Sequence, residues 1–389
     1  MTATWFAREV TWLSNRTRRW WLAGLALGLA TVGAVAASAV VEMPQAQRPA
    51  APPATVPPAQ AAEAGSAVRF VAPSGSDAAP GTPEEPWRSL QHALTSISAG
   101  QTLYVRGGTY TENVHVTGSQ VHPGTSTRPI HVLAYPGERP VVEGLLWLTN
   151  PSYWYLDGIS VTWSRANSSD DHMVKLLGGT GWRFGNAELW GARSYAALLV
   201  GRGATDFLVD HNFIHDTYAS NDENQDHLMY IDNGPDGSGV IEQNILARSP
   251  NGRGVKLGPG SLDQPGTDNI VIRYNTFYDN RGPSNIQLSG SSSDNQVYGN
   301  LLDEPADGSA NITAWNLTGR NNVVRDNLGG HSAGVADFDS DGFVDGGGNV
   351  HADPKLTDPA RDDFTPQQPK AARYGSAEAA ADLVEPRAP

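Results

Sequence analysis

Phe207-Leu-Val-Asp-His-Asn212-Phe-Ile carries a pattern that recurs through the second half of this 389-residue chain: an apolar run, an Asn, and further apolar residues. A period of 25 to 32 residues, with β-branched runs and no helical pattern between them, indicates stacked β-coils. Each coil must pack on its neighbours to bury its apolar face. We therefore predict an all-β, right-handed parallel β-helix (a single-stranded solenoid) over residues 67–350, with the Asn side chains hydrogen-bonded from coil to coil. The repeated Asn residues are Asn186, Asn212, Asn244, Asn275, Asn300 and Asn327.

The composition agrees with a turn-rich all-β body and excludes several classes of site. Gly (42) and Pro (27) are plentiful, and charged residues make up 17% of the chain. Because there is no Cys, disulfides, thiolate catalysis and metal clusters held by Cys are excluded. The net charge of -14 repels nucleic-acid phosphates, so we expect no nucleic-acid partner, and we expect a monomer.

The N-terminus has the pattern of a membrane or export segment. Residues 20–41 carry no charge and follow a cluster of Arg, and a run of this length can cross the hydrocarbon layer of about 30 Å. We expect residues 1–19 in the cytoplasm, residues 20–41 as a single transmembrane anchor, and the body at the extracellular face. Ala37-Ser-Ala39 offers a cleavage site, so a signal peptide and a secreted body are the alternative. Residues 42–66 read as a Pro/Ala-rich linker and residues 351–389 as a C-terminal tail.

A short amphipathic helix is predicted just before the first coil. Trp87, Leu90, Leu94 and Ile97 fall on one helical face, and Gly100 ends the pattern. Such a helix would cap the open end of the hydrophobic solenoid.

The same region resembles the pectin-lyase-like superfamily of secreted right-handed parallel β-helix proteins. The resemblance covers roughly residues 68–375 and implies action on, or binding to, a polysaccharide or cell-wall glycan. The superfamily includes lyases, hydrolases, epimerases and non-catalytic proteins, so the resemblance specifies the fold more than the activity. The matching residues are Val71-Ala-Pro-Ser-Gly-Ser-Asp77, Gly81-Thr82, Pro86-Trp87 and Gly107-Gly-Thr-Tyr-Thr-Glu-Asn113, with Ala352-Asp-Pro-Lys-Leu-Thr-Asp358 and Asp363-Phe364 at the closing end.

The outward positions of neighbouring coils bring candidate catalytic residues together. Strand alternation places Lys256 outside, with Gln287 on the same outer column. Tyr230 joins this column in one phase of residues 227–231, whereas the opposite phase exposes His227 instead. The sequence leaves both phases open.

Cleavage of a uronate polymer by β-elimination requires neutralisation of the substrate carboxylate, a base for the C5 proton, and an acid for the leaving oxygen. The resemblance implies a Lys or Arg base with acidic calcium ligands nearby. We expect Lys256 to be the base, with Arg253 lowering its pKa and Tyr230 or His227 as proton donor. The alternative is an ion pair of Lys256 with Asp232, in which Tyr230 and His227 only pack.

Two groups of acids are candidate calcium ligands. Asp226 and Asp232 flank the strand that contains Tyr230. The segment Asp337-Phe-Asp-Ser-Asp-Gly-Phe-Val-Asp345 matches most of a calcium loop, but Gly348 stands where an EF-hand has its last acid. A solvated acidic turn is the alternative there. The predicted metal ligands are Asp226, Asp232, Asp337, Asp339, Asp341 and Asp345.

Substrate binding is predicted at Gln287, Asp222, Trp190 and Tyr218, since aromatic faces suit sugar rings, with packing as the alternative role of the aromatics. We therefore expect an exported, membrane-anchored β-helix protein that acts on polysaccharide as a uronate lyase or epimerase. A non-catalytic glycan-binding or cell-wall structural protein is the alternative. A glycoside hydrolase is a further alternative, although the adjacent pair Asp170-Asp171 would diverge in an extended segment.

Overall fold

The computed structural model describes residues 68–168, 171–218 and 226–384. The predicted membrane or signal segment (20–41) and the linker (42–66) lie outside these residues. No helix among the described residues is both long enough and apolar enough to span a membrane.

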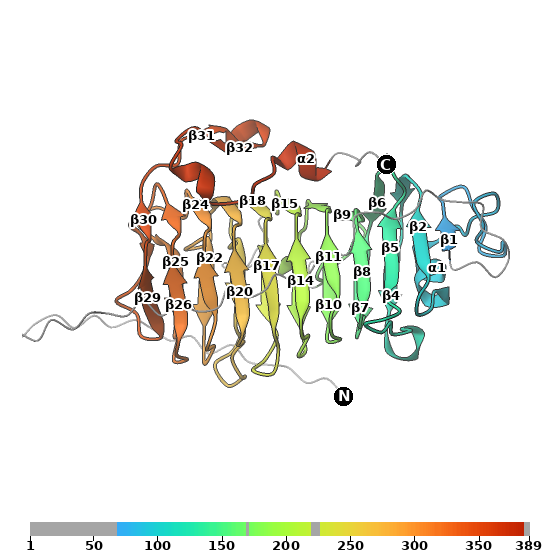
Figure 1. Ribbon diagram of the computed structural model, residues 1–389, viewed down its shortest axis with the longest axis horizontal. Coiled ribbons are helices and arrows are strands. Elements are labelled where there is room, and N and C mark those ends of the chain that lie inside the picture. Colours follow the sequence, from blue (N-terminus) through green and yellow to red (C-terminus); the bar gives the residue numbers. More distant parts are fainter. Residues whose placement is uncertain (1–67, 169–170, 219–225, 385–389) are drawn as a thin grey trace, which may run out of the picture. The chain divides into compact units, whose positions relative to one another are not determined.

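The described chain winds into a right-handed parallel β-helix, as predicted, and each full coil contributes one strand to each of three parallel sheets (Figure 1). Sheet A consists of β1 (Val68–Val71), β2 (Thr102–Val105), β5 (Ile130–Ala134), β8 (Trp154–Asp157), β11 (Arg183–Gly185), β14 (Phe207–Asp210), β17 (Gly239–Glu242), β20 (Ile270–Arg273), β23 (Gln296–Tyr298), β26 (Asn322–Arg325) and β29 (Phe343–Gly347). Sheet B consists of β3 (Gly108–Tyr110), β6 (Pro140–Glu143), β9 (Ser160–Thr162), β12 (Glu188–Trp190), β15 (Phe213–His215), β18 (Ile245–Ser249), β21 (Thr276–Asn280), β24 (Leu301–Asp303), β27 (Leu328–Gly329) and β30 (Val350–His351). Sheet C consists of β4 (Asn113–Val116), β7 (Leu145–Thr149), β10 (Val174–Leu177), β13 (Ala196–Gly201), β16 (His227–Asp232), β19 (Val255–Leu257), β22 (Ile286–Ser289), β25 (Ala310–Trp315) and β28 (Gly334–Ala336).

The core is one continuous column of apolar side chains inside the coils. Alternate residues of each strand point inward, so equivalent positions stack from coil to coil. In sheet C one such stack runs through Leu198, Met229, Val255 and Ile286, all fully buried. This stacking fixes which side chains of the same strands face outward.

A buried Asn ladder lies at the turn from sheet A to sheet B. The amide of Asn212 donates to Asn244 (2.9 Å), that of Asn244 to Asn275 (2.9 Å), and that of Asn275 to Asn300 (3.1 Å). The ladder continues through Asn327 to Asn349, which the sequence pattern missed.

Asn186 does not belong to this ladder, contrary to prediction. The backbone N–H of Ala187 donates to the side chain of Asn212, so Ala187 occupies the ladder position in that coil. Asn186 instead has a left-handed φ of 55° and donates to Asp157. In this coil the Asn of the sequence pattern therefore comes one residue before the ladder position. It is there because the tight turn favours Asn at a left-handed φ, and not because it joins the ladder.

A short helix, α1 (Leu90–Ser96), precedes the first full coil. Ser89 accepts from the backbone N–H of His92 as the N-cap, and Gln91 makes two hydrogen bonds to the backbone of His115 on β4. Trp87 is buried but lies outside the helix, paired with Val71 in a parallel bridge. The helix is shorter than its apolar pattern because Asp77 accepts from the N–H groups of Arg88 and Ser89, which holds this stretch as a loop.

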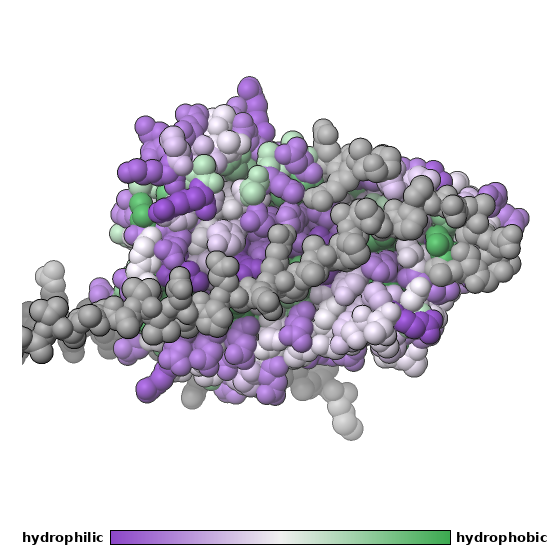
Figure 2. All heavy atoms as spheres, viewed as in Figure 1, coloured by the Kyte–Doolittle hydropathy of each residue, from purple (hydrophilic) through white to green (hydrophobic). Residues whose placement is uncertain are grey.

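The C-terminal tail lies along the outer face of sheet B (Figure 1). It contains an antiparallel pair, β31 (Leu356–Asp358) and β32 (Asp363–Pro366), and the helix α2 (Ala380–Val384). Phe364 and Leu383 pack there against Phe213 and Ile245. The outward side of the tail is mostly hydrophilic in Figure 2, as expected when its apolar side chains face the sheet.

Candidate active site on sheet C

An outward column of polar side chains crosses the middle of sheet C. Tyr230 is in register with Lys256, Lys256 with Gln287, and Gln287 with Thr313. Met229 and Ile231 are buried, so strand β16 adopts the phase that turns Tyr230 outward. The structure thus places Tyr230, Lys256 and Gln287 side by side on three successive coils.

Lys256 lies against Tyr230 and close to Asp232. Its ammonium nitrogen is 4.8 Å from the centroid of the Tyr230 ring. Among the described residues, Lys256 and Asp232 do not form an ion pair within 4.0 Å. The arrangement therefore differs from the simple Lys256–Asp232 pair that was the structural alternative.

The environment shifts the pKa of each group in this cluster. Burial lowers the pKa of Lys256, and the charge of Arg253 lowers it further, while Asp232 opposes the shift. Burial also raises the pKa of Tyr230, as do the charge of Asp232 and a hydrogen bond to its carboxylate. For Asp232 itself, burial raises the pKa against the influence of Lys256 and Tyr230. Lys256 is therefore biased toward its neutral, basic form, while Tyr230 keeps its proton.

His227 and Arg253 lie beneath this column rather than on it. His227 is 1% exposed, and its Nδ1 accepts from the backbone N–H of Arg253 at 3.1 Å. Burial drives the pKa of His227 well below its ordinary value, so the ring is neutral. Arg253 is 2% exposed, and burial lowers its pKa to about 10. His227 is therefore buried away from the surface, and of the two predicted proton donors only Tyr230 lies on the outward column.

The predicted acidic ligands do not converge within the described residues. Asp226 is fully buried, and its backbone carbonyl accepts from the hydroxyls of Thr217 and Ser249. Asp337 accepts from the Ser340 hydroxyl at 2.7 Å, and Asp345 accepts from the N–H of Gly347 at 2.9 Å. The predicted loop ligands Asp339 and Asp341 lie between them on the same turn.

In the described parts of the chain, three potential ligand atoms lie within 4.8 Å of one another only at Asp303, Glu304 and His331. Asp303 ends β24 of sheet B, Glu304 and His331 follow strands of the same sheet, and none of the three was predicted. Calcium at either predicted place therefore stays a prediction, and the described side chains there do not form a fitted cation site.

The predicted sugar-binding residues are not all near Lys256. Trp190 lies on β12 in sheet B, where the guanidinium of Arg139 is 5.5 Å from its ring. Tyr218 follows β15 and is 51% exposed, with the guanidinium of Arg193 at 4.3 Å over its ring. Asp222 lies outside the described residues. Of the four, only Gln287 shares the column of Lys256.

Sequence reasoning missed residues that continue the column toward the N-terminal coils. Lys175 is in register with Trp147, and its ammonium nitrogen is 3.7 Å from the centroid of that ring. His115 stacks on Trp147 at 4.3 Å between ring centroids. Strand alternation signals each as an outward residue. The early coils, however, lack the Asn marker that would have aligned them with later coils.

The comparisons with known proteins support the fold. Residues 69–225 match the family model of the Pel9A-like, right handed beta helix region. The resemblance to pectin-lyase-like right-handed parallel β-helix proteins is confirmed. The match ends before the candidate residues Tyr230, Lys256 and Gln287, so it gives no evidence on their roles.

Similar proteins include pectate lyases. Pectate lyase PEL9 of Emericella nidulans is 43% identical over 77 residues, which is 19% of this chain and 18% of that protein. Pectate lyase L of Paenibacillus polymyxa is 27% identical over 221 residues, 53% of this chain and 42% of that protein. The crystal structure of pectate lyase Pel9A aligns with a TM-score of 0.50 at 14% identity, covering 80% of this chain and 90% of that one. The chain thus spans less than half the length of these two curated relatives, and the solved structure supports the fold alone.

Proposed function

We propose that this protein is a polysaccharide lyase that cleaves a uronate polymer by β-elimination on the outer face of sheet C. The observation that carries the proposal is the position of Lys256. Its ammonium group lies over the Tyr230 ring, and both burial and Arg253 lower its pKa. A Lys whose pKa is lowered, beside a phenol whose pKa is raised, offers the base and the acid that this reaction requires.

In the proposed reaction Lys256 removes the C5 proton of the uronate with its neutral Nζ. The electron pair of the C5–H bond forms the C4=C5 double bond, and the bond from C4 to the leaving oxygen breaks. Tyr230 donates its hydroxyl proton to that oxygen, and the Lys256 ammonium then gives its proton to the Tyr230 phenolate, which restores both groups. Arg253 is a positioning residue, since it is buried and acts on the pKa of Lys256. We draw no step through calcium, because the described acids at Asp226 and Asp232 form no fitted site for it.

The sequence pattern of the N-terminus supports export of the folded body. The charge-free residues 20–41, behind a cluster of Arg, would hold the protein at the extracellular face of the membrane or be removed on secretion. This location suits an enzyme that meets a polymeric cell-wall glycan.

The test is product formation from a panel of uronate polymers, followed by the ultraviolet absorbance of the unsaturated product. The wild-type protein should give product, and Lys256→Ala should lower turnover by about 10²–10⁴-fold with an unchanged circular dichroism spectrum, since it removes the base. Lys370→Ala, an exposed Lys on the tail, is the matched control and should keep full activity.

The alternatives give other outcomes. Retained activity in Lys256→Ala would remove Lys256 from the mechanism. Binding without product across the panel would identify a non-catalytic glycan-binding protein. New reducing ends without unsaturation would identify a glycoside hydrolase, and inversion at C5 without cleavage an epimerase.

A further inference from the structure

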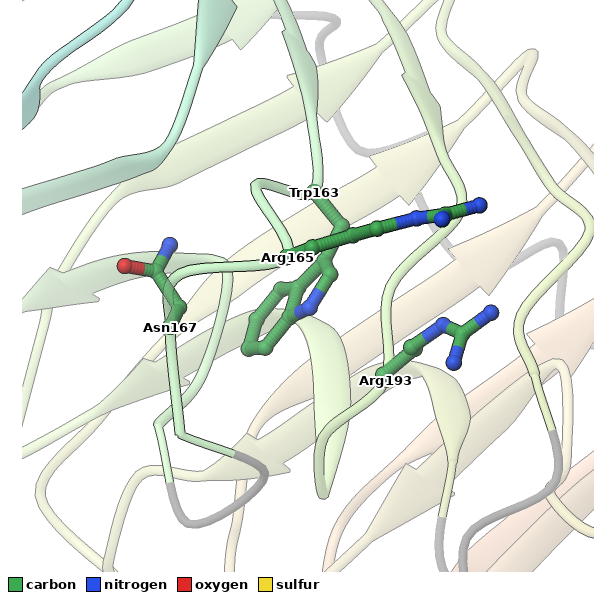
Figure 3. A pocket seen from close by; sticks show the side chains of 4 residues that line it. All are labelled: Trp163, Arg165, Asn167 and Arg193. Atoms are coloured by element: carbon green, nitrogen blue, oxygen red, sulfur yellow. The ribbon is translucent and has the colours of Figure 1, made fainter.

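A hollow of about 370 Å³ opens beside sheet C, away from the Tyr230–Lys256 pair. Trp163, Arg165 and Asn167 line it from the segment between β9 and β10, and Arg193 lines it from the segment between β12 and β13 (Figure 3). Trp163 is 8% exposed and forms a fixed wall. The side-chain oxygen of Asn167 accepts from Asn113 on β4 at 2.9 Å, which ties this segment to an earlier coil.

Two Arg side chains line this hollow. Arg165 and Arg193 extend in the same direction past the Trp163 ring (Figure 3), and both are exposed. Arg193 is held at 4.3 Å over the ring of Tyr218. Among the described residues, neither Arg forms an ion pair within 4.0 Å. The charge of Asp171 instead raises the pKa of Lys175 and of His115 against the effect of burial. Two exposed positive charges that line one hollow, on a protein of net charge -14, favour an anionic ligand there.

We propose that this hollow binds an anionic group, the carboxylate or sulfate of a sugar, on the same polymer that reaches Lys256. The inference rests on the proposed function for the direction of the polymer, which would lie along the outer face of sheet C. Guanidinium groups suit this ligand because their planar donors can bind a carboxylate or sulfate through paired hydrogen bonds.

The order of strands in sheet C sets the separation of the two sites. Arg165 precedes β10 and Arg193 precedes β13, and β10, β13, β16 and β19 are successive neighbours in the sheet. Along the axis of the coils, the hollow is therefore two to three coils before Lys256, a rise of about 10–14 Å at the strand spacing of about 4.8 Å. An anionic group bound there belongs to a sugar several units from the bond that is cleaved. Oligomers long enough to reach the hollow should therefore bind more tightly than short ones.

The experiment compares Arg165→Gln/Arg193→Gln with Arg320→Gln/Arg361→Gln in the full chain, since both double variants remove two exposed Arg. Each is made on the Lys256→Ala background so that the ligands stay intact. Calorimetry measures the dissociation constants for an oligouronate trisaccharide and octasaccharide and for a sulfated glucan that contains no uronate. We expect Arg165→Gln/Arg193→Gln to weaken octasaccharide binding by about 10–100-fold and trisaccharide binding by less than twofold. The control should change neither, and both variants should keep the parent melting temperature.

Each outcome bears on the proposal. Weakened octasaccharide binding would support the anion site, and weakened binding of the sulfated glucan in addition would show that the site also accepts sulfate. Unchanged octasaccharide binding, or an equal loss for both chain lengths, would overturn the proposal. The lyase proposal is tested separately. If the wild type makes no unsaturated product but Arg165→Gln/Arg193→Gln still weakens octasaccharide binding, the lyase proposal is refuted and the anion site is retained. Normal product formation with unchanged affinity would refute the anion site alone.

Discussion

The pKa of Lys256 depends on its burial and on the charges of its neighbours. Burial and the guanidinium of Arg253 favour the neutral amine, whereas the carboxylate of Asp232 favours the ammonium. Burial and the charge of Asp232 raise the pKa of Tyr230, whereas burial and Arg253 lower the pKa of Lys256, so the two neighbours shift in opposite directions. Two adjacent groups with oppositely shifted pKa values are the arrangement expected of a general acid and base pair.

Asp232→Asn should move the pH profile of the proposed lyase to lower pH. A Lys base is active when deprotonated, so activity rises as pH rises through the pKa of Lys256, which lies below the ordinary 10.5. Asp232 raises that pKa, so removing its charge should lower the pKa further and bring the rise to lower pH. The measurement is kcat/KM against pH for unsaturated product. A rise in activity at unchanged or higher pH would contradict the assignment of Lys256 as the base. Asp307→Asn, at a fully exposed position, is the control and should not shift the pH profile.

At the scale of the elements, the Asn ladder joins the turns between sheets A and B. Asn275 is fully buried, donates to the backbone carbonyls of Ile241 and Arg273, and accepts from both the N–H and the amide of Asn244. The ladder thus satisfies backbone groups that the turns would otherwise leave buried and unpaired.

Asn275→Ala should destabilise the protein by about 2–4 kcal/mol, because it leaves several buried backbone and side-chain groups without partners. Asn186→Ala is the matched control. Asn186 is half-buried, lies outside the ladder and donates only to Asp157, so we expect a loss of no more than about 1.5 kcal/mol. Denaturant unfolding followed by circular dichroism measures both. Equal losses would show that the ladder has no special contribution.

At the scale of the whole molecule, the three outer faces differ in what covers them. The C-terminal tail covers apolar residues on the outside of sheet B, including Phe213 and Ile245, and adds an ion pair of 2.7 Å between Arg248 and Asp362. Sheet C has an outward column of Lys and aromatic residues instead, from Trp147 and Lys175 to Tyr230 and Lys256. The tail thus covers the outer face of sheet B, whereas sheet C presents the column on which the proposed polymer would lie.

Phe364→Ala should loosen the tail. Phe364 is 4% exposed and packs against Phe213, with ring centroids 6.0 Å apart, and Tyr278, at 5.8 Å. We expect a loss of about 3 kcal/mol and faster proteolysis within the tail, since the cavity separates it from sheet B. Leu262→Ala, at a 54% exposed position, should change stability by less than about 0.5 kcal/mol. An intact, protease-resistant tail in Phe364→Ala would show that other contacts hold it.

The repeated Asn and the alternation of apolar residues were enough to predict the parallel β-helix. Both patterns follow from short-range rules: a period of two along each strand, and one coil for each return of the ladder. The same rules predicted that Lys256 and Gln287 share an outer column. The phase of Tyr230, the burial of His227, the place of Ala187 in the ladder, and the Arg165–Arg193 hollow did not follow from them. Those features depend on how turns of unequal length bring successive coils into register, and packing across coils, rather than any local pattern, sets that register.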